Sequence, residues 1–111
     1  MSKIFCSLHL TMQIIGTKWK PLVLFHLLDG PLRSGILQKK IPEISIKMFT
    51  QTVRELEKDG LIHRTVYPEV PPRVDYTLTP EGQSLDSILK SLDAWGKERF
   101  MLETLKKEYF Q

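Results

Sequence analysis

The spacing of apolar residues along the chain predicts five helices and one β-hairpin. Apolar positions three and four residues apart indicate an amphipathic helix, whereas alternating apolar and polar positions indicate a strand. The helices expected on this basis cover residues 8–15, 18–28, 35–40, 46–59 and 80 to about 110. Two runs rich in β-branched and aromatic residues, 61–67 and 73–79, predict the hairpin.

Capping residues mark the ends of these helices. A side-chain oxygen that can accept a hydrogen bond from the first turn precedes four of them, at Thr17, Ser34, Ser45 and Thr79. Gly30 and Gly60 are the expected C-terminal caps of the helices 18–28 and 46–59. The helix 18–28 is apolar nearly all round, which predicts that it is buried at the centre of the fold.

The two helices 35–40 and 46–59 are separated by the short segment 42–44, which is typical of the turn in a helix-turn-helix. The hairpin follows directly, and three prolines at its tip (Pro68, Pro71 and Pro72) cannot donate ladder hydrogen bonds, so the tip must leave the sheet. Leu32 and Arg33 are expected to pair with the hairpin as a short strand. A helix-turn-helix followed by a projecting hairpin predicts a winged-helix domain, a fold that binds DNA.

The helix 46–59 has two faces on a helical wheel. One face is apolar and should meet the core, with Ile46, Phe49, Val53 and Leu56. The other is basic and polar, with Lys47, Gln51, Arg54 and Lys58. Arginine and lysine can reach guanine, glutamine can pair with adenine, and Ser45 at the helix N-terminus can hold a phosphate. The alternative is a solvated amphipathic face, which any surface helix shows.

The last helix, about 45 Å long at 1.5 Å per residue, is too long for a domain of this size to cover. Its apolar residues form a seam that is interrupted at Arg99 and comprises Leu85, Ile88, Leu92, Trp95, Leu102 and Tyr109. A projecting apolar seam usually meets another chain, so we expect a homodimer. The alternative is a helix that folds back on its own core.

Composition and charge limit the classes of protein that fit. The chain has 111 residues and a net charge of +3, which suits one domain with an anionic partner such as double-stranded DNA. No apolar run approaches 18 residues, so we expect no membrane segment and a cytoplasmic protein. The three histidines lack metal-ligand spacing, and no catalytic motif or phosphate loop appears. We therefore expect no metal, no cofactor and no enzymatic activity.

Cys6 is the one cysteine and the only candidate for redox chemistry. If the first helix begins near Ser7, its N-terminal dipole would favour a thiolate, and Lys3 could assist. The alternative is an apolar cysteine packed between helices.

Several short motifs carry a family resemblance. They are Gly16-Thr17-Lys18-Trp19, Asp29-Gly30-Pro31-Leu32-Arg33, Ile44-Ser45-Ile46-Lys47-Met48, Arg54-Glu55-Leu56-Glu57, Asp59-Gly60-Leu61-Ile62, and the run from Tyr67 to Thr79 followed by Gly82. Together they resemble the HxlR family of winged-helix transcriptional regulators, from about Cys6 to Trp95. The resemblance implies a homodimer on a roughly palindromic operator, with DNA contacts from the recognition helix and the wing, including Arg73.

The resemblance also implies dimerisation through the N-terminal and C-terminal helices, including Leu8, and sensing of electrophiles or oxidants through Cys6 in the manner of several members. The family's Arg-Phe-x-Glu-Leu run is replaced here by Arg33-Ser34-Gly35-Ile36-Leu37, which removes an aromatic group and weakens that helix. No later cysteine exists to pair with Cys6.

We expect a single domain over 1–111, with a DNA-binding core at 16–79 and dimerisation helices at 1–15 and 80–111. The expected function is that of a sequence-specific regulator of transcription, in the form of a dimeric repressor. The competing hypothesis is a winged helix that docks an acidic protein partner on its basic face. The sequence identifies no inducer.

Overall fold

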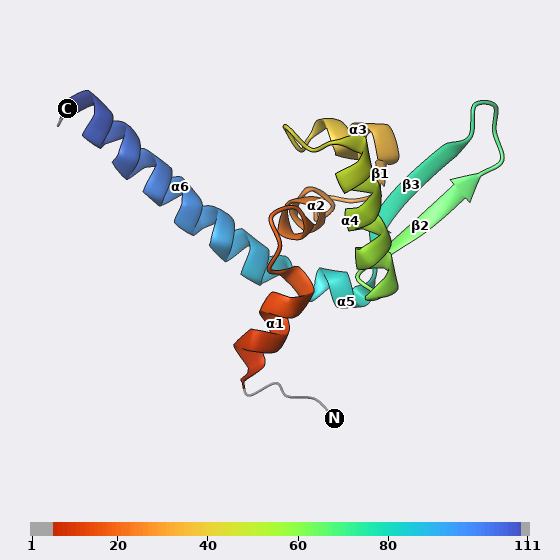
Figure 1. The fold of residues 1–111 in the computed structure, drawn as a ribbon, viewed down its shortest axis with the longest axis horizontal. Helices are drawn as coiled ribbons and strands as arrows, with labels where there is room; N and C mark the ends of the chain where they lie inside the picture. The colour runs from red at the N-terminus through yellow and green to blue at the C-terminus, as the bar shows by residue number, and fades with distance from the viewer. Residues whose placement is uncertain (1–5, 110–111) are drawn as a thin grey trace.

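The chain folds into a helical body with a small sheet at its edge, as the computed structural model of residues 6–109 shows (Figure 1). The elements follow in the order α1 (Ser7–Ile15), α2 (Lys20–His26), β1 (Leu32–Arg33), α3 (Ser34–Lys39), α4 (Ile46–Lys58), β2 (Ile62–Tyr67), β3 (Arg73–Leu78), α5 (Pro80–Gln83) and α6 (Asp86–Tyr109). Three parts project from the body in different directions: α1, α6, and the hairpin of β2 and β3 (Figure 1). The fold is therefore mainly α with a small sheet, as predicted.

The core lies between α2, α3, α4 and one face of the sheet. Its most deeply buried side chains are Val23, Leu24 and Leu27 from the α2 region, Leu37 from α3, and Leu56 from α4. Each such side chain stabilises the fold by about 1.5–3 kcal/mol relative to leaving it in water. The central position of α2 is thus confirmed, although its Leu22 remains 39% exposed.

The sheet has the strand order β1-β3-β2 and is antiparallel throughout. In the hairpin, Arg64 lies opposite Tyr76 and Tyr67 lies opposite Arg73. Because side chains alternate between the two faces of a strand, Arg64 and Tyr76 share the inner face, which meets α4, and Tyr67 and Arg73 share the outer face. The predicted hairpin and the predicted short strand at Leu32–Arg33 are both confirmed.

Two predictions about helix starts are wrong. Ser34 does not cap α3 but is its first residue, because Arg33 is still paired in β1, with Asp75 of β3, and occupies the cap position. Ile46 does not face the core and is 72% exposed. It stands in the first turn of α4, beyond the last layer of core side chains, where Ile44 of the preceding turn is buried instead.

The ends of α2 also differ from the prediction. The helix begins at Lys20 rather than Lys18, although the Thr17 hydroxyl accepts the predicted type of capping bond, from the Lys20 amide at 3.3 Å. It ends at His26, with Leu27 as its C-cap, and turns carry the chain on to Gly30 at φ 134°. Leu27 reaches the core from this turn.

The predicted long C-terminal helix is two helices. Thr79 caps α5 as expected, by accepting a hydrogen bond from the Gly82 amide at 3.1 Å. The chain then turns at Ser84 and Leu85, where amides bond to carbonyls three residues earlier, including Leu85 to Gly82 at 3.1 Å. The tighter turn redirects the chain, and α6 leaves the body as a separate helix of 24 residues, about 36 Å long.

Candidate nucleic-acid interface

The basic face of α4, which comprises Lys47, Gln51, Arg54 and Lys58, is exposed along its whole length. On the opposite side of the helix, Phe49, Val53 and Leu56 are buried. Ser45 caps the helix as predicted, because its hydroxyl accepts a hydrogen bond from the Met48 amide at 3.0 Å. The four side chains of the basic face therefore lie together on a helix whose opposite face is packed into the core.

A buried charge fixes α4 to α2. The Lys20 side chain is only 10% exposed, and its Nζ lies 3.5 Å from Oε2 of Glu55. Because an unpaired buried ammonium is costly, this ion pair ties the middle of α4 to the start of α2. The pair draws the Glu55 carboxylate toward α2 and away from the centre of the basic face.

The turn between α3 and α4 has one unusual backbone conformation. Glu43 adopts φ 69°, in the left-handed region that a side chain disfavours. The buried side chains of Ile41 and Ile44 flank this residue and fix the turn from both sides. The predicted helix-turn-helix at this place is present.

The wing is formed by β2, β3 and the loop between them, and its outer face carries paired charges. Arg73 donates two hydrogen bonds to Asp75, and its guanidinium lies 4.7 Å from the centre of the Tyr67 ring. Arg33 lies 3.9 Å from Glu69 across the same face. The hydrogen bond from Arg73 lowers the pKa of Asp75. Arg73 is therefore part of the internal bracing of the wing, and its contact with a DNA phosphate stays a prediction.

A polar recess lies in the angle between α4 and the inner face of the wing. We call it the α4–wing recess, and it is lined by Ser34, Thr50, Val53, Arg54, Glu57, Arg64, Val74 and Tyr76. Arg64 is not among the DNA-binding residues predicted from the sequence. The alternation Ile62, Arg64, Val66 along β2 could have placed it on the same face as the buried Ile62.

Cys6 is exposed and stands immediately before α1. Its Sγ accepts a hydrogen bond from the His9 amide at 3.4 Å, which is a weak N-terminal cap. The predicted start of the first helix near Ser7 is confirmed, and in this single chain the thiol is not packed between helices. Lys3, predicted to assist the thiolate, lies outside the described residues.

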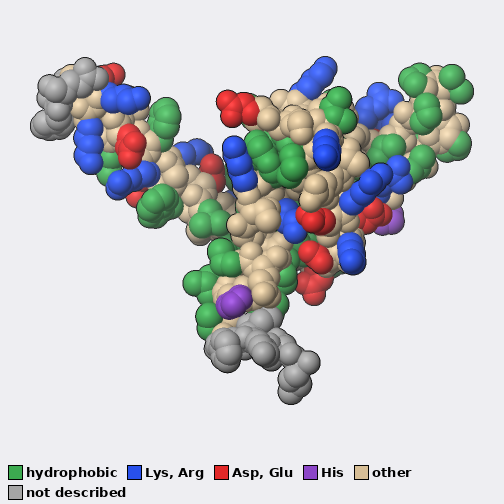
Figure 2. Space-filling view, viewed as in Figure 1, with side chains coloured by type: hydrophobic (Ala, Val, Ile, Leu, Met, Phe, Trp, Pro, Cys, Tyr) green, Lys and Arg blue, Asp and Glu red, His purple; other side chains and the backbone are tan. Residues whose placement is uncertain are grey.

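The candidate dimer surface runs along α6 and α1, where apolar side chains gather away from the body (Figure 2). Trp95 is 67% exposed, and Leu92 and Leu8 are exposed to a similar degree. Ile88 and Leu102 are also exposed, whereas Leu85 is partly buried against the core. The side chain of Tyr109 is not among those that the structure describes. The predicted seam thus projects from the body, except at Leu85.

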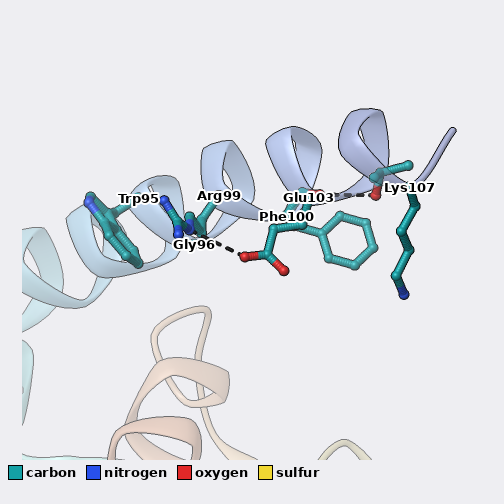
Figure 3. A pocket seen from close by; sticks show the side chains of 7 residues that line it. Trp95, Gly96, Arg99, Phe100, Glu103 and Lys107 are labelled. Atoms are coloured by element: carbon teal, nitrogen blue, oxygen red, sulfur yellow. Dashed lines mark hydrogen bonds and ion pairs between the residues drawn. The ribbon is translucent and has the colours of Figure 1, made fainter. Parts of the chain in front are cut away.

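Sequence reasoning missed two features of α6. Leu89, one position beyond the predicted seam residue Ile88, is the side chain that α6 buries in the core, at 2% exposure. Farther along, Trp95, Arg99, Phe100 and Glu103 line a shallow groove on one side of the helix (Figure 3). Phe100 is 75% exposed there, so the exposed apolar surface of α6 is wider than the predicted seam.

Other kinds of site find little support in residues 6–109. That part of the chain contains no cluster of His, Cys, Asp and Glu that could hold a metal ion. It also has no helix that is both long enough and apolar enough to cross a membrane. Burial, and then the charge of Lys40, lower the pKa of the partly buried His26.

A helix-turn-helix with an exposed basic second helix, followed by a two-stranded wing that belongs to a three-stranded sheet, defines the class of winged helix-turn-helix proteins. Within that class, residues 14–104 match the model of the HxlR-like helix-turn-helix family, and the chain belongs to this family. Its members are transcriptional regulators and not enzymes, and helix-turn-helix regulators bind DNA. The chain is accordingly a transcriptional regulator.

Curated relatives agree with this assignment. The chain is 53% identical over 92 residues to an HTH-type transcriptional regulator of Methanothermobacter thermautotrophicus, with 83% of this chain and 70% of the relative covered. It is 48% identical over 96 residues to the HTH-type transcriptional regulator YkvN of Bacillus subtilis, with 86% and 81% covered.

Solved structures share both the fold and much of the sequence. A MarR-family transcriptional regulator from Porphyromonas gingivalis has a TM-score of 0.83 at 39% identity, covering 88% of this chain and 96% of the other. The redox regulator HypR in its reduced form has a TM-score of 0.81 at 39% identity, with 89% and 99% covered. The reduced form of the transcriptional regulator YodB from B. subtilis has a TM-score of 0.71 at 33% identity, with 86% and 94% covered.

Proposed function

We propose that the protein is a sequence-specific, dimeric repressor that binds a roughly palindromic operator through the basic face of α4 and the wing. The observation that carries this proposal is the exposure of Lys47, Gln51 and Arg54 on a helix whose opposite face is buried and whose middle is tied to α2 by the Lys20–Glu55 pair. A rigid helix with such side chains suits a major groove, where arginine reads guanine and glutamine reads adenine.

In this proposal the chain is one domain, acting on DNA in the cytoplasm. Residues 16–79 form the DNA-binding core, and the segments 1–15 and 80–111 form the dimer. Two copies joined along α6 and α1 would present their α4 helices about 34 Å apart, which is one turn of DNA. The exposed apolar side chains on both helices support this arrangement.

Binding titrations of the wild type and two variants test the function. Arg54→Ala should weaken binding to the operator by about 1–3 kcal/mol if Arg54 makes a bidentate base contact, with a smaller effect on a shuffled duplex. Arg73→Ala should instead weaken binding to all sequences together, as expected for a phosphate contact. If neither variant changes affinity, the assignment of this surface is wrong.

The competing function is docking of an acidic protein partner on the basic face of α4. A duplex competitor distinguishes the two. Binding to DNA that is selective for sequence and weakens steeply with salt supports the repressor. Binding that ignores duplex sequence, together with a salt-sensitive protein partner, would instead favour docking.

We also propose that Cys6 senses electrophiles or oxidants. The support is its exposure in front of α1 and the similarity of the chain to HypR, a redox regulator solved in oxidised and reduced forms. A structure of diamide-treated YodB from B. subtilis is also similar, at 33% identity and a TM-score of 0.66. With one cysteine per chain, the modified states are an adduct, a mixed disulfide with a small thiol, or a Cys6–Cys6 bridge across the dimer.

A further inference from the structure

The α4–wing recess brings together side chains from four elements of the fold. Arg54 and Thr50 come from α4, Arg64 from β2, Tyr76 from β3, and Ser34 from the start of α3. The groups that these residues offer are two guanidiniums and three hydroxyls. One carboxylate, that of Glu57, lies among them.

The charged groups of the recess act on a common point, the hydroxyl of the buried Tyr76. Burial raises the pKa of Tyr76. The positive charges of Arg64 and Arg54 oppose that rise, whereas the negative charge of Glu57 adds to it. Arg54, Arg64 and Glu57 all line this one recess, so a small ligand held in it would lie beside both guanidiniums and the carboxylate. An anion between the guanidiniums would meet two fixed positive charges and several hydroxyl donors.

The pairing of the wing arginines differs between the two faces of the sheet. On the outer face, Arg33 is paired with Glu69 and Arg73 with Asp75. On the inner face, neither Arg64 nor Arg54 takes part in any ion pair within residues 6–109. The outer arginines thus have internal partners, whereas the charges of the inner arginines are available to an external anion.

The recess also stands where a DNA strand must pass. If α4 enters the major groove and the wing lies over the adjacent minor groove, the sugar-phosphate strand between these grooves runs through the angle between α4 and the wing. The recess occupies this angle. Its donors are suited to a phosphate, which has several acceptor oxygens and a negative charge.

We propose that the α4–wing recess is a subsite for one backbone phosphate of bound duplex DNA, with Arg64 as its principal contact and Arg54 shared between phosphate and base. This inference rests on the proposed function. In this subsite Arg64 anchors the strand on the wing side of α4 and so sets how deeply α4 enters the groove. Glu57 opposes the phosphate and limits affinity for DNA of any sequence.

Fluorescence anisotropy of the full chain with two duplexes tests the subsite. One duplex is enriched by the wild type from a random-sequence pool, and the other is a shuffled duplex of the same length. Arg64→Gln should weaken binding to both duplexes by roughly 10-fold at low salt. It should also reduce the slope of log affinity against log salt by about 0.9 for each protomer bound.

Arg33→Gln is the matched control, because it removes an arginine from the outer face of the same sheet, where its guanidinium lies 3.9 Å from the carboxylate of Glu69. Its salt slope should stay within about 0.3 of the wild type, less than the change for one phosphate. An equal reduction in both variants would overturn the subsite, because total charge rather than position would then decide affinity.

Glu57→Gln provides a second measurement that does not depend on the folding of Arg64→Gln. It should tighten binding to both duplexes by about 3-fold at low salt, because it removes a negative charge beside the phosphate. Unchanged affinity in both Arg64→Gln and Glu57→Gln, with the wild type still binding, overturns the subsite alone. A wild type with no salt-dependent duplex binding overturns the repressor function and the subsite together.

Discussion

Arg73 donates two hydrogen bonds to Asp75, from Nε to Oδ1 at 3.1 Å and from Nη2 to Oδ2 at 2.8 Å. Both residues belong to β3, and their side chains lie on the outer face of the wing. The pair leaves the outer face of the wing nearly neutral beside the loop, although Arg73 remains 39% exposed. In the proposed complex with DNA, the charge on the outer face of the wing would therefore be set by Asp75 as much as by Arg73.

Asp75→Asn should therefore tighten binding to all duplexes by roughly 3-fold at low salt, because it frees the charge of Arg73 for a phosphate. Anisotropy titrations against operator and shuffled duplexes measure the effect. Glu98→Gln, which makes the same change of charge on the exposed surface of α6, should leave affinity unchanged. Equal affinity of Asp75→Asn and the wild type would show that Arg73 does not contact DNA.

Trp95→Asp should produce a folded monomer. Trp95 is 67% exposed in the single chain, so the substitution leaves the core intact, but it places a charge in the proposed dimer surface at a cost of at least about 2 kcal/mol. Sedimentation at micromolar concentration should show a dimeric wild type and a monomeric variant, with unchanged helical circular dichroism. Lys90→Gln, on the polar side of the same helix, should remain dimeric, and a monomeric wild type would contradict the prediction.

Oxidants or electrophiles should weaken operator binding by the wild type by roughly 10-fold, a typical coupling between two sites. Cys6→Ser should abolish this response and retain full affinity in reducing buffer. Operator titrations with and without a quinone or hypochlorite compare the two proteins, and mass spectrometry identifies the product. Full affinity of wild-type protein with modified Cys6 would rule out the cysteine as the switch.

Gly82→Ala should destabilise the fold by about 1–3 kcal/mol. Gly82 is buried, and an added Cβ would overlap the carbonyl oxygen of Leu61, a rigid backbone atom. Gly96→Ala is the matched control in the exposed part of α6, where nothing lies near the added methyl, and it should stabilise its helix by up to about 1 kcal/mol. Thermal unfolding of the two variants should therefore shift in opposite directions.

The stability of the protein should depend on His26 between neutral and mildly acidic pH. Burial, with a smaller effect of Lys40, lowers the pKa of His26 below its ordinary value of 6.5, so the unfolded chain takes up a proton more readily than the folded one. The contribution of His26 is thus fully present above pH 6.5 and is lost as the pH falls below it. Urea unfolding from pH 8 to pH 5 should show a smaller decline in His26→Gln than in the wild type.

The sequence predicted those parts of the fold that local chemistry decides. Ser45 and Thr79 are helix caps because each offers a hydroxyl to a free amide, and the prolines end the hairpin strands because they cannot donate. Features that depend on distant neighbours could not be predicted in this way. Ser34 fails as a cap because Arg33, the residue before it, is paired in β1 with Asp75 of β3. Asp75 lies far along the chain from α3, so the residues around the helix start could not reveal this pairing.

The residues of the candidate interface also fall into two groups, those that local sequence could predict and those that depend on contacts between elements. The basic face of α4 could be identified from the helical period, since all of its members lie on one helix. Arg64 could not, because its meaning comes from the register of β2 with β3 and from the packing of α4 beside them. The paired state of Arg73 was equally hidden, although its partner is only two residues away, because the bond requires both side chains on one face of an extended strand.

The break at Ser84 and Leu85 makes α6 a lever with its pivot at the edge of the body. A rotation of about 5° at this pivot swings the far end of a helix about 36 Å long by about 3 Å, close to the rise of one base pair. In the proposed dimer, a substitution at the exposed Ser84 would therefore change the spacing between half-sites while leaving α4 and the exposed apolar side chains of α6 in place. If the proposed dimer forms, its operator preference would depend on a turn that lies outside both the proposed DNA-binding face and the proposed dimer surface.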